Sequence, residues 1–562
     1  MMSDDEDLLR PLMPDRRAQE TLPTLLRDAS ARFGAHEYMV LGERRVTFAD
    51  AERTSAAWAR GLLSLGLGKG TRVGILMPND PEWVLAFLAA GRIGALTVTL
   101  STLFQAPEIS WGVRHNDIDT LLVTARYLNN DYLDRLEQAL PGLATQTTPD
   151  LYLPEHPYLR RIVVWGECDR PWALRGPLAL AEAAAAKPQV DEAFLAAVET
   201  GVVPADLLLA ICTSGTSAAP KSVMHTHGSA LRAVHLFTGY QDLLPDDRTY
   251  SGQAFFWIGG QNSGLLPPLF VGSCLCFAAT PRAANVVDVI RRERVTRLSL
   301  WPAQAVGIAE HVAREGLDLP SVRSGYGEPC DEHGQLIPPD RRPAGWLGMT
   351  ESFGMHSIDQ RPLAMPPGKG GTWGRSLPGV ERAVVDPETN RRLSVGETGE
   401  LYIRGHTLMQ GYYKVEREEV FTRGGWFATG DLVSIDEDDY LRFHGRNSEL
   451  IKTAGANVSP SEVERALAAL PGVREAIVFG LPDPVKGEVV FAVAVPLADC
   501  ELDPCALRET LRQRLSSYKV PQQIVVVPFD EVPRTGSDKA LKRALKKRLA
   551  SHFALATANG EC

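Results

Sequence analysis

A short loop of small and hydroxylated residues carries the strongest chemical signal in this sequence. It reads Thr-Ser-Gly-Thr-Ser-Ala-Ala-Pro-Lys-Ser-Val from Thr213 to Val223 and follows an apolar run, residues 207–211, that predicts a buried strand. Backbone N–H groups, hydroxyl groups and the positive charge of Lys221 would meet at one point, which is the chemistry of a phosphate-binding loop. An ordinary strand-to-helix turn rich in Ser and Thr is the alternative.

The loop nearly matches the Walker pattern G-x-x-x-x-G-K-[ST] from Gly215 to Ser222. Pro220 stands where the second glycine belongs. Proline has no N–H group to offer a phosphate and fixes φ at about −65°, so the Walker cradle cannot close in the same way. We therefore expect a phosphate loop of another kind and disfavour a Walker-type ATPase.

Three further segments could contribute to a binding site. The segment Gly252–Gly260 places three adjacent aromatic residues between glycines, which suits a pocket wall, with plain core packing as the alternative. Gly325-Tyr-Gly-Glu-Pro329 and Leu347-Gly-Met-Thr-Glu351 each follow a predicted strand end, where α/β sheets place their ligands.

Alternating strands and helices must position these segments. Residues 47–66 predict a helix, with Thr47 and Asp50 at capping-box spacing. A strand at 72–77, a helix at 80–93 and a strand at 95–100 follow, and this order predicts a parallel sheet covered by helices. Residues 128–188, rich in Pro, Asp and Tyr, predict a loop-rich excursion.

The second half of the chain changes character twice. Short runs separated by turns predict a small β-rich subdomain over about residues 380–445. From Arg446 a new unit begins, with a predicted capping box at Ser459–Glu462, strands at 473–479, 489–495 and 523–527, and a helix near 504–516. We expect the last helix, 539–549, to dock with its basic face solvated, and a membrane-surface role is the alternative.

Composition limits the class of protein. The 562 residues suffice for several cores, and 44% hydrophobic with 23% charged residues is typical of a soluble globular protein. A net charge of −10 argues against a nucleic-acid partner. The acidic N-terminus lacks a secretory pattern, no apolar run is long enough to predict a transmembrane segment, and the eight cysteines lack zinc-site spacing. We expect a cytoplasmic protein, with its oligomeric state open.

Taken together, these segments resemble the acyl-CoA synthetase branch of the adenylate-forming (AMP-binding) ligase superfamily. The resemblance runs from about residue 47 to 548 and covers six motifs in the family's order. It implies an α/β fold with a large N-terminal domain of two α/β sheets plus a small β subdomain, residues 1–445. It also implies a smaller, mobile α+β C-terminal domain, residues 446–562.

The resemblance also implies a two-step reaction. A carboxylic acid is activated by ATP and Mg²⁺ as an acyl-adenylate, with release of pyrophosphate. The C-terminal domain then swings, and the thiol of coenzyme A, a co-substrate, displaces AMP. The lack of a charged partner in the acyl pocket favours a fatty or other apolar acid, whose length, branching or ring content the sequence does not indicate.

Site residues are carried over position by position. The resemblance implies ATP-binding residues Thr213, Ser214, Gly215, Thr216, Ser217, Lys221, Gly327, Glu328, Pro329, Trp346, Leu347, Gly348, Met349, Asp431 and Arg446. It implies catalytic roles for Lys539, for Thr350 near the α-phosphate and for Glu351 as the Mg²⁺ ligand. It implies an acyl pocket of Phe256, Trp257, Gly325, Tyr326, Phe353 and Met355, a CoA channel at Gly455 and a hinge at Ser448.

Several positions depart from the family pattern. They are Ser217-Ala218 and Ser222 in the phosphate loop, Leu347 in place of an aromatic residue, Trp257 in place of a common His, Ser448 in place of Asp or Lys, and Asp538 in place of Gly. Trp346 is a neighbour that could replace the aromatic residue missing at 347. These departures raise a second hypothesis, a degenerate nucleotide-binding relative with weak or no ligase activity.

The acceptor of the acyl group and the roles of several single residues are further open points. A stand-alone enzyme that passes the acyl group to a carrier protein stays open. A peptide-synthetase adenylation unit is disfavoured, because no carrier segment follows and no Asp follows Phe256-Trp257. We expect His225, His227 and His356 to be non-catalytic, the first two at a helix entry. Asp431 with Arg446 could instead form a structural ion pair, and Glu351 could instead cap a helix.

Overall fold

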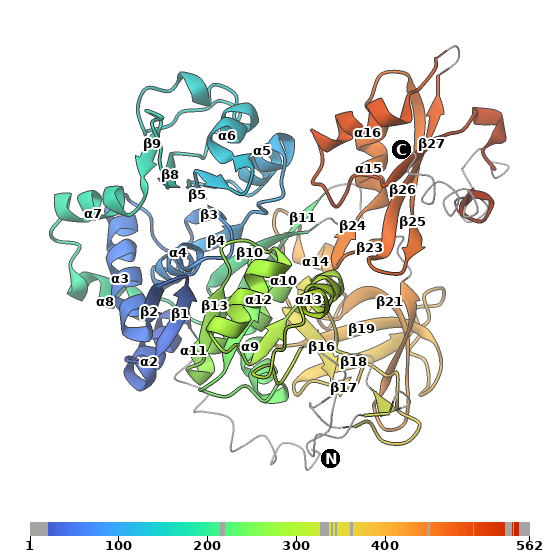
Figure 1. Ribbon diagram of the computed structural model, residues 1–562, viewed down its shortest axis with the longest axis horizontal. Coiled ribbons are helices and arrows are strands. Elements are labelled where there is room, and N and C mark those ends of the chain that lie inside the picture. The colour runs from blue at the N-terminus through green and yellow to red at the C-terminus, as the bar shows by residue number, and fades with distance from the viewer. Residues whose placement is uncertain are drawn as a thin grey trace.

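The computed structural model describes residues 21–213, 220–325, 337–338, 341–342, 345–359, 364–446, 450–497, 500–533, 542 and 545–549. A large N-terminal domain carries a smaller C-terminal domain on one side, drawn in red at the upper right of Figure 1. This confirms the predicted fold class. The boundaries 1–445 and 446–562 remain predictions.

The largest sheet has eight strands, in the order β20-β11-β10-β4-β3-β5-β8-β9. Its strands are β3 (Arg72–Leu76), β4 (Leu96–Thr99), β5 (Thr120–Thr124), β8 (Arg161–Trp165), β9 (Ala173–Arg175), β10 (Leu207–Thr213), β11 (Lys221–Thr226) and β20 (Gly411–Tyr412). The six strands from β10 to β9 are parallel, whereas β11 and β20 add antiparallel pairs at one edge. Alternate side chains enter two different cores, so both faces of the sheet are covered.

Helices cover this sheet on both faces. They are α2 (Leu22–Phe33), α3 (Phe48–Ser64), α4 (Pro81–Arg92), α5 (Ala106–His115), α6 (Tyr132–Ala139), α7 (Gly176–Ala186) and α8 (Glu192–Thr200), with a short hairpin β6 (Arg126–Tyr127) and β7 (Asn130–Asp131) and the 3₁₀ turn η2 (Leu143–Thr145). α3 begins at the predicted capping box, in which Thr47 and Asp50 bond each other's backbone N–H group. The predicted helix at 80–93 and strands at 72–77 and 95–100 are confirmed by α4, β3 and β4.

The loop-rich excursion predicted for residues 128–188 is wrong. This region holds α6, α7 and two further strands of the main sheet, with β8 paired to β5 from Thr120↔Arg161 onward. The strand Arg161–Trp165 is only five residues long and lies between turn-forming segments rich in Pro and Asp. A run this short gives too weak a periodic signal to predict a strand. Asp131 caps α6 by accepting N–H bonds from Leu133 and Asp134.

A second sheet of five strands has the order β14-β12-β13-β1-β2. Its strands are β1 (Glu37–Leu41), β2 (Arg44–Thr47), β12 (Arg248–Ser251), β13 (Cys274–Phe277) and β14 (Arg297–Ser299). The associated helices are α9 (His227–Tyr240), α10 (Ile258–Gly260), the π-helical η3 (Gln261–Leu265), α11 (Pro267–Val271), α12 (Ala283–Arg292) and α13 (Pro302–Arg314).

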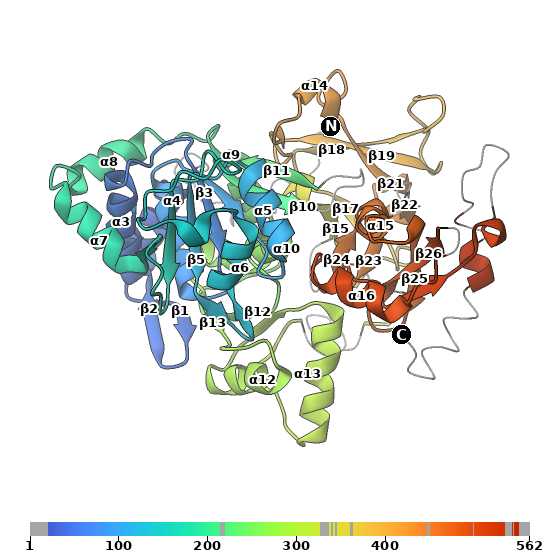
Figure 2. The same cartoon turned by 90° about the horizontal axis from the view of Figure 1, so that it is seen from above.

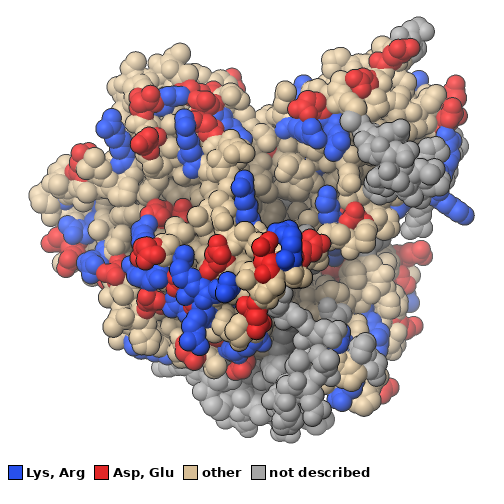
Figure 3. Space-filling view, viewed as in Figure 1, with Lys and Arg blue, Asp and Glu red and all other residues tan. Residues whose placement is uncertain are grey.

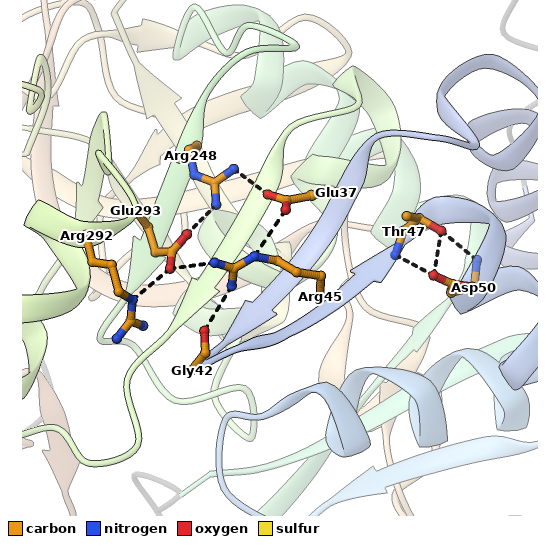
Figure 4. Close-up of polar contacts among 8 residues, drawn as sticks. All are labelled: Glu37, Gly42, Arg45, Thr47, Asp50, Arg248, Arg292 and Glu293. Atoms are coloured by element: carbon orange, nitrogen blue, oxygen red, sulfur yellow. Dashed lines mark hydrogen bonds and ion pairs between the residues drawn. The ribbon is translucent and has the colours of Figure 1, made fainter.

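An ion-pair cluster ties the N-terminal hairpin of this sheet to elements about 200 residues later (Figure 4). Arg248 lies 2.8 Å from both Glu37 and Glu293, and Arg45 contacts the same two carboxylates at 3.2 and 3.1 Å. Arg292 adds a third contact to Glu293, whose side chain is 5% exposed. Burial raises the pKa of Glu293, but the surrounding guanidinium groups outweigh it and hold the pKa below its ordinary value.

Residues 380–445, predicted to be β-rich, hold an antiparallel sheet of β18 (Val380–Val385), β19 (Gly399–Gly405), β21 (Phe427–Ile435) and β22 (Leu441–Arg446), with the short α14 (Arg417–Val420). A second small antiparallel sheet precedes this range. It consists of β15 (Leu347–Met349), β16 (Gly354–Ile358) and β17 (Arg375–Ser376), with the 3₁₀ turn η5 (Thr350–Ser352).

The C-terminal domain is built on one sheet with a core on each face. It contains β23 (Ile451–Thr453), β24 (Ala456–Val458), α15 (Pro460–Ala468), β25 (Val473–Asp483), β26 (Gly487–Pro496), α16 (Pro504–Arg512), β27 (Gln523–Val526) and η6 (Phe529–Glu531). Val478 and Val490 pack under α15 and α16, whereas Phe479 and Phe491 face Leu545 on the opposite side. This alternation is the period of two expected for β-strands.

The capping box predicted at Ser459 is wrong. The Ser459 hydroxyl bonds the Ser461 hydroxyl at 2.9 Å and caps no backbone N–H group. The carboxylate of Glu462 is engaged in an ion pair with Lys519. Tertiary contacts therefore override the local motif here. Among the described residues, every helix is too short or too polar to span a bilayer.

We predict that Glu293→Gln lowers the melting temperature by roughly 5 °C at neutral pH, because it leaves Arg45 and Arg248 without a shared buried partner. Differential scanning calorimetry measures the shift. The matched control is Glu381→Gln, whose ion pair with Arg404 is exposed and should change the temperature by less than about 1 °C. Equal shifts for the two variants would contradict the structural role of the cluster.

Candidate active site

Two adjoining cavities lie where the N-terminal sheets, the β subdomain and the C-terminal domain meet. Their volumes are about 300 and 840 Å³. They share the wall residues Thr213, Ile258, Gly259, Trp301, Thr350, Gly455 and Asn457. Figures 1 and 2 both show the hairpin β23–β24 of the C-terminal domain facing β10 and α10 of the N-terminal domain. The cavities are therefore joined at the junction of the two domains.

The phosphate loop connects two antiparallel strands. Lys221 opens β11 and pairs with Thr213 at the end of β10, and α9 begins only at His227. The alternative of an ordinary strand-to-helix turn is therefore wrong, and the Walker arrangement, which opens a helix after its loop, is excluded. Ser214, Gly215, Thr216 and Ser217 lie outside the described residues.

A tyrosine links the two charged residues on the wall of the larger cavity. The Tyr412 hydroxyl donates a hydrogen bond to Glu351 Oε1 at 2.8 Å, and Lys221 Nζ lies 4.5 Å from the centre of the Tyr412 ring. Burial and the Glu351 charge raise the pKa of Tyr412, which therefore stays a donor. Sequence reasoning named Lys221 and Glu351 and missed Tyr412, which only the pairing of β20 with β11 brings beside them.

A buried histidine holds the turn that carries Thr350 and Glu351. His225 Nε2 donates to the Thr350 carbonyl oxygen at 2.7 Å, and its ring meets Phe353 edge-on at 4.9 Å. Burial lowers the pKa of His225 to about 4, so its imidazole is neutral. His225 lies in β11, so its expected place at a helix entry is wrong, whereas His227 does begin α9.

The adenine-side motif places all of its residues except Leu347 on the wall of the larger cavity. Trp346, Gly348 and Met349 line the larger cavity. Leu347 instead points into the core beside Leu401. A Cβ on Gly348 would lie 2.0 Å from the Gly354 carbonyl oxygen, so only glycine fits there.

Asp431 and Arg446 are cross-strand partners in β21 and β22. Asp431 is buried, and its neighbours Thr429 and Gly430 line the larger cavity. Gly325 has φ +87°, and a Cβ there would lie 1.9 Å from the Leu298 carbonyl oxygen. The side chain of Arg446, together with Tyr326, Gly327, Glu328 and Pro329, lies outside the description.

Of the residues assigned to the acyl pocket, the structure brings Trp257 to a cavity wall. Its ring meets Trp301 at 6.3 Å and Tyr518 at 5.7 Å, both nearly perpendicular, and all three line the smaller cavity. Phe256, Phe353 and Met355 are buried behind the wall and line neither cavity. Trp301 and Tyr518 were missed, because nothing in the sequence places them beside Trp257.

Gly455, at the tip of the hairpin β23–β24, touches the N-terminal domain. It has φ +86°, and a Cβ there would lie 2.1 Å from the Trp301 ring. Only glycine fits at this close approach, and the CoA channel implied at Gly455 remains a prediction. Lys539 and Ser448 lie outside the described residues.

A buried cation connects the two domains on the wall of the smaller cavity. Lys519 Nζ lies 2.7 Å from Glu108 in α5 and 2.8 Å from Glu462 in α15. The Ser516 hydroxyl donates to Glu108 at 2.8 Å. Burial alone would lower the pKa of Lys519, but the neighbouring charges outweigh it and hold the pKa above its ordinary value.

Comparison with known proteins identifies the class. The chain belongs to the AMP-binding enzyme family, whose model matches residues 26–413, and the AMP-binding enzyme C-terminal domain matches residues 462–539. It is 28% identical to feruloyl-CoA synthase of Amycolatopsis over 92% of this chain and 97% of that protein. It is also 28% identical to 4-coumarate–CoA ligase 1 of Arabidopsis thaliana over 90% of this chain and 88% of that protein.

Solved structures show the same fold. One is o-succinylbenzoate CoA synthetase from Bacillus subtilis, with a TM-score of 0.70 at 22% identity, covering 93% of this chain and 97% of that one. Another is the amide bond synthetase McbA from Marinactinospora thermotolerans, with a TM-score of 0.72 at 22% identity, covering 93% and 99%. The family match and the CoA-ligase relatives identify the chain as an adenylate-forming ligase of the acyl-CoA synthetase branch, a class that uses ATP, Mg²⁺ and CoA.

The residues present fit these substrates. Among the described residues, no cluster of three or more His, Cys, Asp or Glu side chains could hold a metal ion by itself. Glu351 lies on the wall of the larger cavity, which also carries Lys221, Glu400 and Glu419. One carboxylate beside a phosphate site suits Mg²⁺, which keeps most of its ligands from water and phosphate oxygens.

We predict that His225→Gln makes the melting temperature less sensitive to acid. The folded pKa of His225, about 4, is below the ordinary 6.5, so the unfolded chain binds the proton first and stability is lost as pH falls from about 6.5 to 4. Glutamine keeps a donor for Thr350 but does not titrate. Between pH 7 and pH 4.5 the variant should lose roughly 3 °C less than wild type. Identical pH profiles would contradict this assignment.

Proposed function

We propose that this enzyme activates a fatty or other apolar carboxylic acid as its acyl-adenylate and passes the acyl group to CoA. The observation that carries the proposal is the contact of Gly455 with Trp301 in a cavity that also reaches Thr213 and Thr350. The aromatic wall of Trp257, Trp301 and Tyr518 supports an apolar acyl group. The names of the relatives include hydroxycinnamate and hydroxybenzoate ligases, so aromatic acids belong to the candidates.

In the first step, a carboxylate oxygen of the acid bonds to the α-phosphorus of ATP, and the bond from that phosphorus to pyrophosphate breaks. Negative charge gathers in the transition state, and Lys221, Arg446 and Lys539 offset it. Asp431 binds the ribose, Thr350 lies near the α-phosphate, and Glu351 would hold Mg²⁺, which would neutralise phosphate charge. Losing one such positioned contact costs about 10²–10³ in rate.

In the second step, the sulfur of CoA bonds to the acyl carbon, the bond from that carbon to AMP breaks, and the thiol proton passes to solvent. A side chain at position 455 would collide with Trp301, so the hairpin tip could not dock and complete the cavity through which we propose that the thiol reaches the adenylate. We assign the present arrangement of domains to this step, because the hairpin tip is docked.

The first step requires another arrangement of the domains, in which Lys539 reaches the phosphates. Described residues that follow Lys539 in the chain are anchored in the C-terminal domain, so Lys539 would move with that domain. Lys542 pairs with Glu464 at 2.8 Å, and Leu545 packs into the C-terminal core. We therefore propose that domain 446–562 rotates about a hinge at Ser448 between the two steps. We also propose a cytoplasmic location for the enzyme.

We predict that two variants lose opposite half-reactions, one adenylate formation and the other thioester formation. Gly455→Ala should keep acid-dependent exchange of pyrophosphate into ATP but lose thioester formation from supplied acyl-AMP by at least about 10²-fold, because the methyl group collides with Trp301. Lys539→Ala should do the reverse. A panel of straight-chain and aromatic acids in the exchange assay identifies the acid.

The matched control is Gly66→Ala, since Gly66 also has positive φ but has open space where the Cβ would lie. It should change neither half-reaction. Equal loss of both half-reactions in Gly455→Ala would contradict the proposal that each half-reaction uses its own arrangement of the two domains. Absence of exchange with every acid in wild-type enzyme would favour a degenerate nucleotide-binding relative.

We predict that Glu108→Gln slows thioester formation roughly tenfold and leaves pyrophosphate exchange unchanged, because the Lys519 contact forms only when the domains are docked. Single-turnover rates of the two half-reactions measure the difference. The control is Glu137→Gln, which weakens an ion pair with Arg170 inside the N-terminal domain and should spare both rates. Slowing of both half-reactions by Glu108→Gln would contradict the assignment.

A further inference from the structure

Strand β20 leads into two adjacent tyrosines whose side chains lie in different surroundings. Tyr412 pairs with Val223 of β11, and the backbone N–H group of Tyr413 donates to the Ser222 carbonyl oxygen at 2.9 Å. Successive side chains of an extended chain point to opposite faces. Accordingly, Tyr412 lies on the wall of the larger cavity, whereas the Tyr413 hydroxyl donates to Asp117 at 2.8 Å, outside that cavity.

Tyr412 contacts two charged groups to which the proposed function gives roles in binding the nucleotide. Its hydroxyl donates to Glu351 Oε1 at 2.8 Å, and Lys221 Nζ lies 4.5 Å from the centre of its ring. Only 8% of Tyr412 is exposed, so both contacts lie largely out of water. Glu351 lies on the cavity wall, and its Oε2 accepts no hydrogen bond from any residue that the structure describes. The tyrosine hydroxyl thus fixes one oxygen of the carboxylate and leaves the other for a cation.

Lys221 and Glu351 line the same cavity but do not pair with each other. Within the described part of the chain, Lys221 makes no ion pair with any carboxylate. Elsewhere on the molecule, Lys and Arg side chains lie beside Asp and Glu side chains over much of the visible face (Figure 3). Opposite charges on a largely desolvated wall attract each other strongly. The Tyr412 ring occupies the space beside Lys221, and its hydroxyl occupies the space beside Glu351, so the tyrosine keeps the two charges apart.

The backbone of Glu351 is held independently of its side chain. The Met409 N–H group donates to the Glu351 carbonyl oxygen at 2.8 Å, and the Gln410 N–H group donates to the Met224 carbonyl oxygen at 2.8 Å. Both bonds belong to the segment that leads into β20. The carboxylate of Glu351 can still rotate about its side-chain bonds, and the Tyr412 hydroxyl restrains that rotation.

We propose that Tyr412 is a positioning residue of the nucleotide site: its hydroxyl orients Glu351 toward Mg²⁺, and its ring keeps Lys221 apart from that carboxylate and free to bind phosphate groups. This inference rests on the proposed function, in which Glu351 and Lys221 have these roles. Tyr412 acts only through these two residues.

The test measures equilibrium binding of ATP by isothermal titration calorimetry, with Mg²⁺ and with EDTA, so that it does not depend on turnover. Tyr412→Phe keeps the ring and loses the hydroxyl. It should reduce the gain in ATP affinity that Mg²⁺ provides roughly tenfold and leave the affinity in EDTA unchanged. Tyr412→Leu removes the ring as well and lets Lys221 pair with Glu351. It should therefore also weaken ATP binding in EDTA roughly tenfold.

The matched control is Tyr413→Phe, at the next residue of the chain. This variant loses the hydrogen bond to Asp117, which keeps its ion pair with Lys414 at 2.9 Å, and it should change neither affinity. Melting temperatures show whether each variant is folded at the temperature of the titration. If Tyr412→Leu is unfolded there, the comparison of Tyr412→Phe with Tyr413→Phe decides.

Two results would overturn this inference alone. One is that Tyr412→Phe leaves both affinities unchanged or weakens them equally with Mg²⁺ and with EDTA, because the hydroxyl would then not act through Glu351. The other is that Tyr413→Phe shows the same Mg²⁺-dependent loss, because the strand as a whole would then be disturbed. Wild-type enzyme that binds no ATP under either condition would overturn the proposed function and this inference with it.

Discussion

The docked arrangement of the two domains depends on one buried cation between two carboxylates. Lys519 has 4% of its side chain exposed, and it meets Glu108 of the N-terminal domain and Glu462 of its own domain. Removing three charges from water is costly, so such a cluster adds little net stability and mainly favours one geometry over others. In the proposed domain rotation Glu108 would be hydrated again, so the contact would form and break during the reaction cycle.

That geometry explains why the hairpin tip lies where it does. With α5 and α15 held together, Gly455 is pressed against Trp301, and Tyr518 closes the aromatic wall beside Trp257. On the other side, β20 extends the main sheet and places Tyr412 between Lys221 and Glu351. The contacts among Lys221, Tyr412 and Glu351 thus lie within the N-terminal domain, whereas the contacts of Gly455 and Tyr518 with the aromatic wall require the C-terminal domain to be docked.

The sequence was sufficient where local patterns decide the structure. The capping box of Thr47 and the apolar periodicity of β3, α4, β25 and β26 predicted these elements, because burial of one face follows directly from residue order. It failed at Ser459, where Glu462 pairs with a lysine 57 residues later. It also failed for residues 128–188, where short strands join a sheet whose other members lie elsewhere in the chain.

In the candidate site, too, the residues found from sequence motifs differ from those that only contacts between distant segments bring together. The family resemblance pointed to Lys221, Thr350, Glu351 and Gly455, which the structure brings to the walls of two joined cavities. Tyr412, Trp301, Tyr518 and the Glu108–Lys519 pair were not found, because each depends on contacts between segments far apart in sequence. Phe353 and Met355 were assigned to the acyl pocket beside the adenine-side motif, but both side chains are buried in the core.

The central claim is that docking of the hairpin tip defines one of two domain arrangements. Pulsed electron paramagnetic resonance between spin labels on the exposed positions Tyr152 and Val485 tests it directly. With acyl-AMP and a non-reactive CoA thioether, we expect one narrow distance distribution that matches the docked arrangement described here. With ATP alone, a second, distinct distance should dominate. A single unchanged distance under both conditions would contradict the account.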